Sequence, residues 1–248
     1  IQRINFTMPD IAYIILLTIA ASFIQRTTGF GFGIFIMTML PFLMPSYGEA
    51  TTLSGLLALT TSSVVMLKMW RLISWKRLMP VLLTFILVSS VAVTLLKYLD
   101  DRILRHILGF VLILVSLYFV ILSERIHIRP TIPAALCTGT LSGILGGFFG
   151  MQGPPVVLYF LNSEPDRDHY MAIAQGFFVL GNLSMTITRA CNGFFTSAVL
   201  HDYVFALCGI MVGTWLGGIV YRHIPTKIFR YVVYGYIGVS GVILLLTV

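Results

Sequence analysis

Two glycine-rich runs hold the residues of this sequence that are best suited to chemistry. The first is GFGFG at residues 29–33, and the second is GGFFGMQGPP at residues 146–155. Both interrupt long apolar stretches, where a break leaves backbone N–H and C=O groups unpaired unless they line a cavity or are covered by protein. A helix that restarts after a break points free N–H groups and the positive end of its dipole into it, and such N-termini hold anions. We therefore expect two half-helix N-termini to form a small anion cradle.

The alternative for the glycines is that they only allow close helix packing. Pro154 favours the cradle, because proline suits the first turn of a helix and would fix its start just after Gly153. The occurrence of two breaks also favours it, since a lone glycine pattern is a weak signal.

The predicted anion-binding residues lie in the two runs and beside them. Arg26, just before the first run, is the best partner for a negative charge, the alternative being that its side chain snorkels to the membrane surface. Snorkelling is equally reasonable for Arg189. Neutral side chains such as Gln175 and Asn182 would donate hydrogen bonds either to the anion or between helices. The predicted set is Gln25, Arg26, Thr28, Gly29, Gly31, Gly33, Gly150, Gln152, Gly153, Pro154, Asn182 and Arg189.

The other polar residues predict no catalytic group, no metal and no cofactor. The carboxylates fall at the ends of apolar runs, so no buried acid relay is evident and anion transport is favoured over cation transport. The cysteines and histidines show no metal-ligand spacing. Ser142 has no histidine deep in another run to activate it, which disfavours an intramembrane hydrolase.

Apolar residues dominate the chain: of 248 residues, 58% are hydrophobic and 10% are charged, whereas soluble proteins average about 25% charged residues. So few charges cannot cover the surface of a soluble globule, which excludes a soluble enzyme and predicts a membrane protein. The net charge of +7 fits loops that face anionic lipid headgroups. No compact basic patch indicates a nucleic-acid partner.

The apolar runs predict an all-α polytopic membrane protein. Residues 10–47 would extend about 57 Å as one helix and residues 131–162 about 48 Å, against a hydrocarbon core of about 30 Å. Both segments must therefore bend, and their glycine runs are the natural breaks. Six further runs have ordinary spanning length: approximately residues 51–70, 78–97, 103–123, 171–191, 203–221 and 228–247.

The two broken segments resemble copies of one unit. Superposing them places Gly29 on Gly150 and Gly31 on Gln152, and three apolar runs follow each segment. The last runs begin with similar patterns, DRILR at residues 101–105 and TKIFR at residues 226–230. We therefore predict two repeats, residues 1–125 and 126–248. Chance similarity among apolar helices is the alternative.

Basic residues gather in one short loop of each half, and both loops should face the cytoplasm. They are Lys68, Arg71, Lys76 and Arg77 in the first half and Arg222, Lys227 and Arg230 in the second. Because the two loops occupy non-equivalent places in the repeat, the halves are predicted to be inverted. Each would be a broken, re-entrant helical hairpin followed by three transmembrane helices, with both termini outside. The loop with Glu164, Asp166 and Asp168 disagrees with this orientation, because it is acidic on a side predicted to be cytoplasmic. Acidic residues, however, contribute little to the rule that places basic loops in the cytoplasm.

The segments FIQRTTGFGFGIFIMTMLP, residues 23–41, and SGILGGFFGMQGPPVVLYFL, residues 142–161, resemble the sulfite exporter TauE/SafE family, also called the toluene sulfonate uptake permease family. The resemblance covers nearly the whole chain. It implies a multi-pass secondary carrier in the bacterial inner membrane that moves sulfite or a short organosulfonate such as sulfoacetate.

These observations together predict an exporter of a small sulfur-containing anion that works by alternating access between inverted halves. The alternatives are a passive anion channel and a carrier of another small organic anion. The expected partners are the anion, the lipid bilayer and a coupling ion, either proton or sodium. Small-residue stretches such as residues 213–218 would pack helices within one protomer or between protomers of a homo-oligomer.

Overall fold

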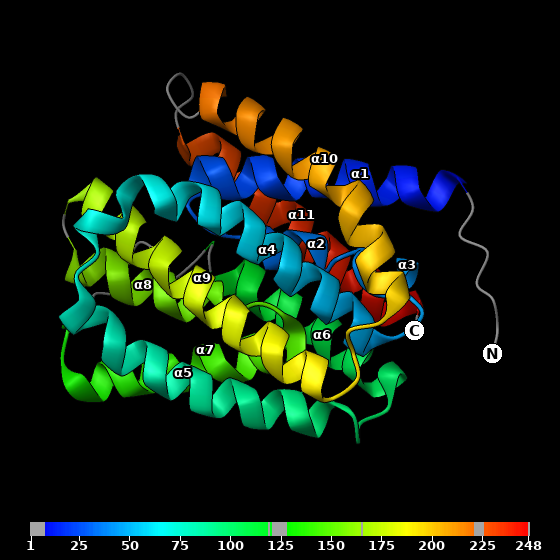
Figure 1. The fold of residues 1–248 in the computed structure, drawn as a ribbon, viewed down its shortest axis with the longest axis horizontal. Helices are drawn as coiled ribbons and strands as arrows, with labels where there is room; N and C mark the ends of the chain where they lie inside the picture. The colour runs from blue at the N-terminus through cyan, green and yellow to red at the C-terminus, as the bar shows by residue number, and fades with distance from the viewer. Residues whose placement is uncertain (1–7, 119, 121–127, 165, 221–225, 248) are drawn as a thin grey trace.

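The computed structural model describes residues 8–118, 120, 128–164, 166–220 and 226–247 (Figure 1). Within those ranges the chain is helical and contains no strand. The helices are α1 (Met8–Thr28), α2 (Phe32–Ile36), α3 (Leu40–Leu43), α4 (Tyr47–Met69), α5 (Trp75–Leu96), α6 (Asp101–Leu117), α7 (Ile132–Phe149), α8 (Gly153–Ser163), α9 (Arg167–Cys191), α10 (Ser197–Val220) and α11 (Thr226–Thr247).

Among the described residues, six helices are long and apolar enough to cross a membrane: α1, α4, α5, α7, α9 and α10. This confirms the prediction of an all-α polytopic membrane protein. Four of these helices, α4, α5, α9 and α10, correspond to predicted spanning runs, and α1 and α7 are the first helices of the two broken segments, with 21 and 18 residues. The other two predicted runs, residues 103–123 and 228–247, overlap α6 and α11, and each includes residues whose side chains the structure does not describe.

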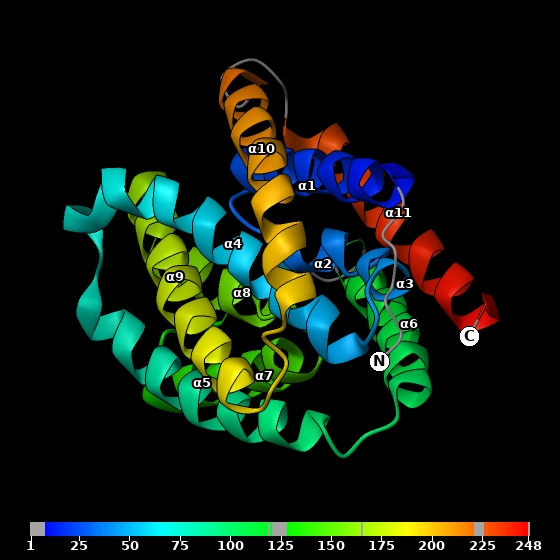
Figure 2. The same ribbon diagram turned by 45° about the vertical axis from the view of Figure 1, so that its right-hand side comes forward.

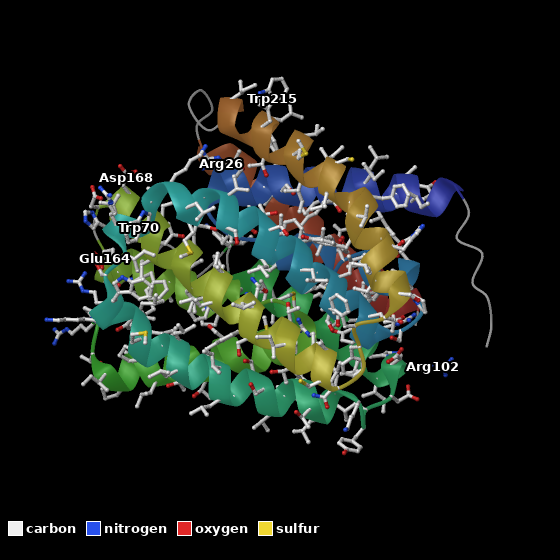
Figure 3. All side chains as sticks on the ribbon, in the orientation of Figure 1. Arg26, Trp70, Arg102, Glu164, Asp168 and Trp215 are labelled. Atoms are coloured by element: carbon white, nitrogen blue, oxygen red, sulfur yellow. The ribbon has the colours of Figure 1, made fainter. Side chains whose placement is uncertain are left out.

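The helices cross one another at different angles, and α10 crosses α1 steeply in Figure 2. The two broken segments start from opposite ends of the molecule. In Figure 1, α1 begins at the right-hand end and the chain has returned there when α4 begins. Helix α7 begins at the left-hand end, and the chain has returned to that end after α8. Figure 3 labels Trp70, Glu164 and Asp168 at the left-hand end and Arg102 at the right-hand end.

Four helix pairs form the most extensive contacts, and each pair joins a helix of residues 1–125 to a helix of residues 126–248. These pairs are α1 with α10, α5 with α7, α4 with α9, and α6 with α11. Figures 1 and 2 both show α4 and α9 lying between the α1–α10 pair and the α5–α7 pair. The two parts of the chain therefore interlock.

Glycines bring three of these pairs into backbone contact, the third being α6 with α11 at Gly109 and Gly241. In α10, a Cβ on Gly209 would lie 2.8 Å from the carbonyl oxygen of Ile15 in α1, and a Cβ on Gly213 would overlap that of Ile19. In α7, a Cβ on Gly139 would lie 2.6 Å from the carbonyl oxygen of Val81 in α5. Close contacts of this kind are typical of helix packing in membranes. Gly213, part of a stretch for which the sequence allowed packing within or between protomers, thus packs within the protomer.

The acidic loop that disagreed with the predicted orientation lies beside a basic one. Arg77 forms an ion pair of 2.9 Å with Glu164, and its guanidinium also donates to the carbonyl oxygen of Ser163. The acids therefore share an end of the molecule with the basic residues of the first half, and the charge of Glu164 is partly compensated there.

Candidate functional site

Both of the long apolar segments that were predicted to bend, residues 10–47 and 131–162, break at their glycine runs. Helix α1 ends at Thr28, and the next glycines adopt left-handed backbone conformations, with φ of +86° at Gly29 and +96° at Gly31. Gly31 caps the N-terminus of α2. In the second segment, Gly150 has a φ of +68° and caps the C-terminus of α7. Only glycine adopts these angles without strain, which explains the residue type at each turn.

The two breaks meet although they are far apart in sequence. A Cβ on Gly33 would overlap the carbonyl oxygen of Gly150. Gly153, the first residue of α8, lies beside the Phe30 ring, which comes within 3.8 Å of the position that a Cβ on Gly153 would take. Glycine at residue 33 therefore allows the backbones of the two breaks to touch.

A small cavity lies where the breaks meet. The space available to the centres of water-sized molecules is about 20 Å³, which is enough for about one ordered water. The cavity is lined by Gln25, Gly31, Phe32, Gly33, Ile34, Ala58, Ser62, Gly150, Met151, Gln152, Gly153, Phe178 and Asn182. These residues come from both breaks and from α4 and α9, and among the described residues that line the cavity there is no carboxylate.

Amide and hydroxyl side chains form the polar part of this cavity. Gln25 Nε2 donates to Ser62 Oγ at 2.7 Å, and Gln175 Nε2 donates to the carbonyl oxygen of Gly29 at 2.8 Å. Asn182 Nδ2 donates to the Phe178 carbonyl of its own helix. Gln152 Oε1 is buried and has no hydrogen-bond partner within the described part of the protein. The cavity is thus neutral and rich in hydrogen-bonding groups.

Arg189 lies fully buried beside the second break, with 0% of its surface exposed. Its Nη2 donates to the carbonyl oxygens of Gly146 at 3.0 Å and Gly147 at 3.3 Å. These are carbonyls of the last turn of α7, where the helix dipole is negative, so the guanidinium stabilises the end of that helix. Arg189 is the one cationic side chain that is buried in the described part of the chain. A snorkelling position is therefore wrong for Arg189.

The family of the chain follows from comparison with known proteins. The family of sulfite exporters called "Sulfite exporter TauE/SafE" matches residues 14–244. The chain belongs to the TauE/SafE family. Members of this family are transporters and not enzymes, and with six helices in its described part that are long and apolar enough to span, the chain is a multi-pass protein of the bacterial inner membrane.

A curated relative from Cupriavidus necator is similar to this TauE/SafE protein along most of its length. It is named "Probable sulfite/organosulfonate exporter TauE" and is 22% identical over 202 residues, which are 80% of this chain and 79% of the relative. No solved structure is significantly similar to the chain.

Several residues predicted to bind the anion lie outside the cavity of this TauE/SafE protein. Thr28 Oγ1 donates to the carbonyl oxygens of Ile24 and Phe30 and closes the end of α1. Gly29 offers its carbonyl to Gln175, and Pro154 lies in the first turn of α8.

Arg26 lines a different groove, between α1, α4 and α10, together with Lys68 and Trp215. Figure 3 shows Arg26 and Trp215 near each other at the top of the molecule.

The two half-helices of this TauE/SafE protein are unequal. Helix α8 has 11 residues and begins with Pro154 in its first turn, whereas α2 has only five residues. The chain turns at residues 37–39, and Pro41 lies in the first turn of α3. A five-residue helix aligns few peptide dipoles, so the expectation of two matching positive ends holds mainly for α8.

Sequence reasoning missed the contribution of α4. Ala58 and Ser62 line the cavity, and Ser54 Oγ lies 3.6 Å from the position that a Cβ on Gly150 would take. The available signal was the run of Ser, Thr and Gly residues within an apolar span, at residues 51–63. Gln175, a candidate hydrogen-bond donor outside the predicted set, also contacts the first break.

Proposed function

We propose that this protein exports sulfite or a short organosulfonate such as sulfoacetate, and that the anion is held where the two helix breaks meet. The single observation that carries this proposal is the cavity to which both breaks contribute, through Gly31, Gly33, Gly150 and Gly153. The name of the Cupriavidus necator relative supports the choice of substrate.

The chemistry of the cavity favours an anion over a cation. The N-terminus of α8 carries about half a positive charge, and backbone N–H groups at helix N-termini bind oxyanions readily. The side chains of Gln25, Gln152 and Asn182 add amide groups. A cation would be held best by carboxylate oxygens, and the described lining residues hold no carboxylate.

The size of the cavity supports alternating access. With space for about one water, the cavity is too small for a sulfonate and must widen when the anion enters. A permanently open pore would not need such a change. We propose that the breaks move apart on one side of the membrane at a time.

The arrangement of helices supports two inverted repeats, residues 1–125 and 126–248. Under the repeat, α1 corresponds to α7 and α5 corresponds to α10, so the α1–α10 pair is equivalent to the α5–α7 pair. The α4–α9 and α6–α11 pairs each join equivalent helices. A two-fold axis between the halves would produce this pattern, and the broken segments start from opposite ends of the molecule as inversion requires (Figure 1).

Transport by purified protein in proteoliposomes tests the proposal. Vesicles loaded with labelled sulfite, and separately with labelled sulfoacetate, are given a proton gradient or a sodium gradient. We expect concentrative movement of at least one anion with one of the two gradients. Movement that only dissipates the anion's own gradient would identify a passive channel, and movement of formate or acetate alone would identify a carrier of another organic anion.

A further inference from the structure

Arg189 uses only part of its guanidinium in the structure. Nη2 makes both hydrogen bonds, to Gly146 and Gly147, whereas Nε and Nη1 are buried with no hydrogen-bond partner among the described residues. None of the ion pairs in the described ranges includes Arg189. A buried positive charge with two unused donors is costly within a membrane span and usually marks a functional position.

The unused side of Arg189 lies near an unpartnered hydroxyl and an amide oxygen. Its Nη1 lies 2.9 Å from the position of a Cβ on Gly55, and Thr186 Oγ1 and Asn182 Oδ1 both lie 3.8 Å from the same point. The hydroxyl of Thr186 is buried and has no hydrogen-bond partner in the part of the chain that the structure describes. Glycine at residue 55 leaves the room in which the guanidinium lies against α4.

The cluster of Arg189, Thr186 and Asn182 at Gly55 adjoins the cavity on one side. Asn182 belongs to both, since it lines the cavity and lies beside Arg189 at Gly55. Arg189 follows Asn182 by two helical turns of α9, and Gly55 precedes Ala58 by about one turn of α4. Because α4 and α9 pack together and run in opposite directions (Figure 1), both helices place the cluster on the same side of the cavity, toward the start of α4.

Further buried polar groups lie beyond Arg189, toward the start of α4. Tyr47, at the start of α4, is fully buried, its hydroxyl has no partner among the described residues, and it lies within electrostatic range of Arg189, Arg105 and Asp101. The Nε of Arg105 is also buried without a partner in the described ranges. Two acids lie in this region: Asp101 accepts the backbone N–H of Tyr47 at 2.9 Å, and Glu49, in the first turn of α4, accepts from Thr196 Oγ1 at 2.7 Å.

We propose that Arg189, Thr186 and Tyr47 form a second binding position for the transported oxyanion, which the anion occupies after it leaves the cavity between the breaks. This inference rests on the proposed function. Arg189 supplies the positive charge that the cavity lining lacks, and the two hydroxyls donate to the anion's oxygens. The position lies toward the end of the molecule that the basic loops predict to be outside, so it is the exit side of an exporter.

The test is sulfite and sulfoacetate efflux from proteoliposomes by variants of the full chain. Tyr47→Phe and Thr186→Val are the sharpest variants, because each removes a hydroxyl that bonds to no described residue. Tyr203→Phe and Thr188→Val are the matched controls, since their hydroxyls bond to Thr60 and to the Ser184 carbonyl respectively.

Three further variants test the charge. Arg189→Gln removes it, Arg189→Lys keeps it, and Arg102→Gln is the control at an exposed arginine.

We expect Arg189→Gln to slow efflux by about tenfold or more, the equivalent of a hydrogen bond to a charged group, and Arg189→Lys to restore part of the rate. Tyr47→Phe and Thr186→Val should each slow efflux severalfold while the three controls stay within about twofold of wild type.

Two results would contradict the proposal of a second binding position. One is normal efflux in Arg189→Gln. The other is lost efflux in Arg189→Gln with normal rates in Tyr47→Phe and Thr186→Val, which would make Arg189 a brace for the end of α7 alone. If Arg189→Gln does not fold, Arg189→Lys and the hydroxyl variants decide by the same criteria. A wild-type protein that moves neither anion would instead defeat the proposed function.

Discussion

The backbone of Gly33 lies directly against the carbonyl oxygen of Gly150, so that no side chain fits between the two helix breaks. Each break on its own is a turn with left-handed glycines. Their contact makes one site out of two segments that lie in different halves of the chain, and it gives the most direct test of the site's architecture.

Gly33→Ala should destabilise the protein and abolish transport, because the new methyl group would overlap Gly150 and push the breaks apart. Forcing an extra methyl into a packed site costs about 1–3 kcal/mol. Thermal unfolding in detergent measures the loss. Gly235→Ala in α11 is the matched control, since no atom of the described residues lies within 4 Å of its Cβ position, and it should unfold at the wild-type temperature or slightly above it, because alanine favours a helix over glycine. Equal stability of the two variants would mean that the breaks are not in contact.

Gly153→Val should fold but fail to transport. The atoms nearest to a Cβ at this position lie 3.8–3.9 Å away, which is ordinary contact distance, and the residue begins α8, where a side chain is tolerated. The branched side chain would nonetheless occupy the cavity. Folding is checked by size-exclusion profile and unfolding temperature, and transport by sulfite efflux. Efflux at the wild-type rate from well-folded Gly153→Val would place the anion elsewhere.

Arg26→Gln should change how fast the anion arrives and leave its affinity in the cavity nearly unchanged. Arg26 lines the groove that also contains Lys68, and it does not line the cavity. We expect the anion to approach along this groove, where basic residues raise the association rate by about tenfold or more at low salt and the effect is screened at high salt. The measurement is sulfite association at two ionic strengths. A salt-independent affinity loss of about 1.5–3 kcal/mol would instead place Arg26 in contact with the anion.

Cysteines introduced near Asp100 and Thr196 should react with an impermeant thiol reagent added outside, whereas cysteines near Ser74 and Thr226 should not. The basic loop that includes Lys76 sets this orientation, and Figure 3 places Trp70 and Arg102 at opposite ends of the molecule. The native Cys137, Cys191 and Cys208 are exposed and must be replaced first. Labelling of the Ser74 and Thr226 sites from opposite sides would contradict the inverted arrangement.

The breaks were predictable from sequence because both glycine runs lie inside apolar segments that are too long to cross the membrane as one straight helix. The burial of Arg189 was not predictable, because a basic residue near the end of a span can snorkel or turn inward, and only the packing of α4 against α9 at Gly55 decides between the two positions. Arg26 shows the opposite case. It is adjacent to the first glycine run in sequence, yet the helical rotation at the end of α1 directs it toward α10, where Gly217 packs against its side chain.

The glycine contacts described for α1 with α10 and for α7 with α5 have a mechanical consequence. Backbones that touch without intervening side chains have few rotamers to rearrange, so we expect each pair to move as one body. Each body contains the first helix of one broken segment and a helix from the other half of the chain. We therefore expect any motion that widens the cavity to turn bodies of mixed origin, with its hinge along the contact of α4 with α9 instead of between the two halves of the sequence.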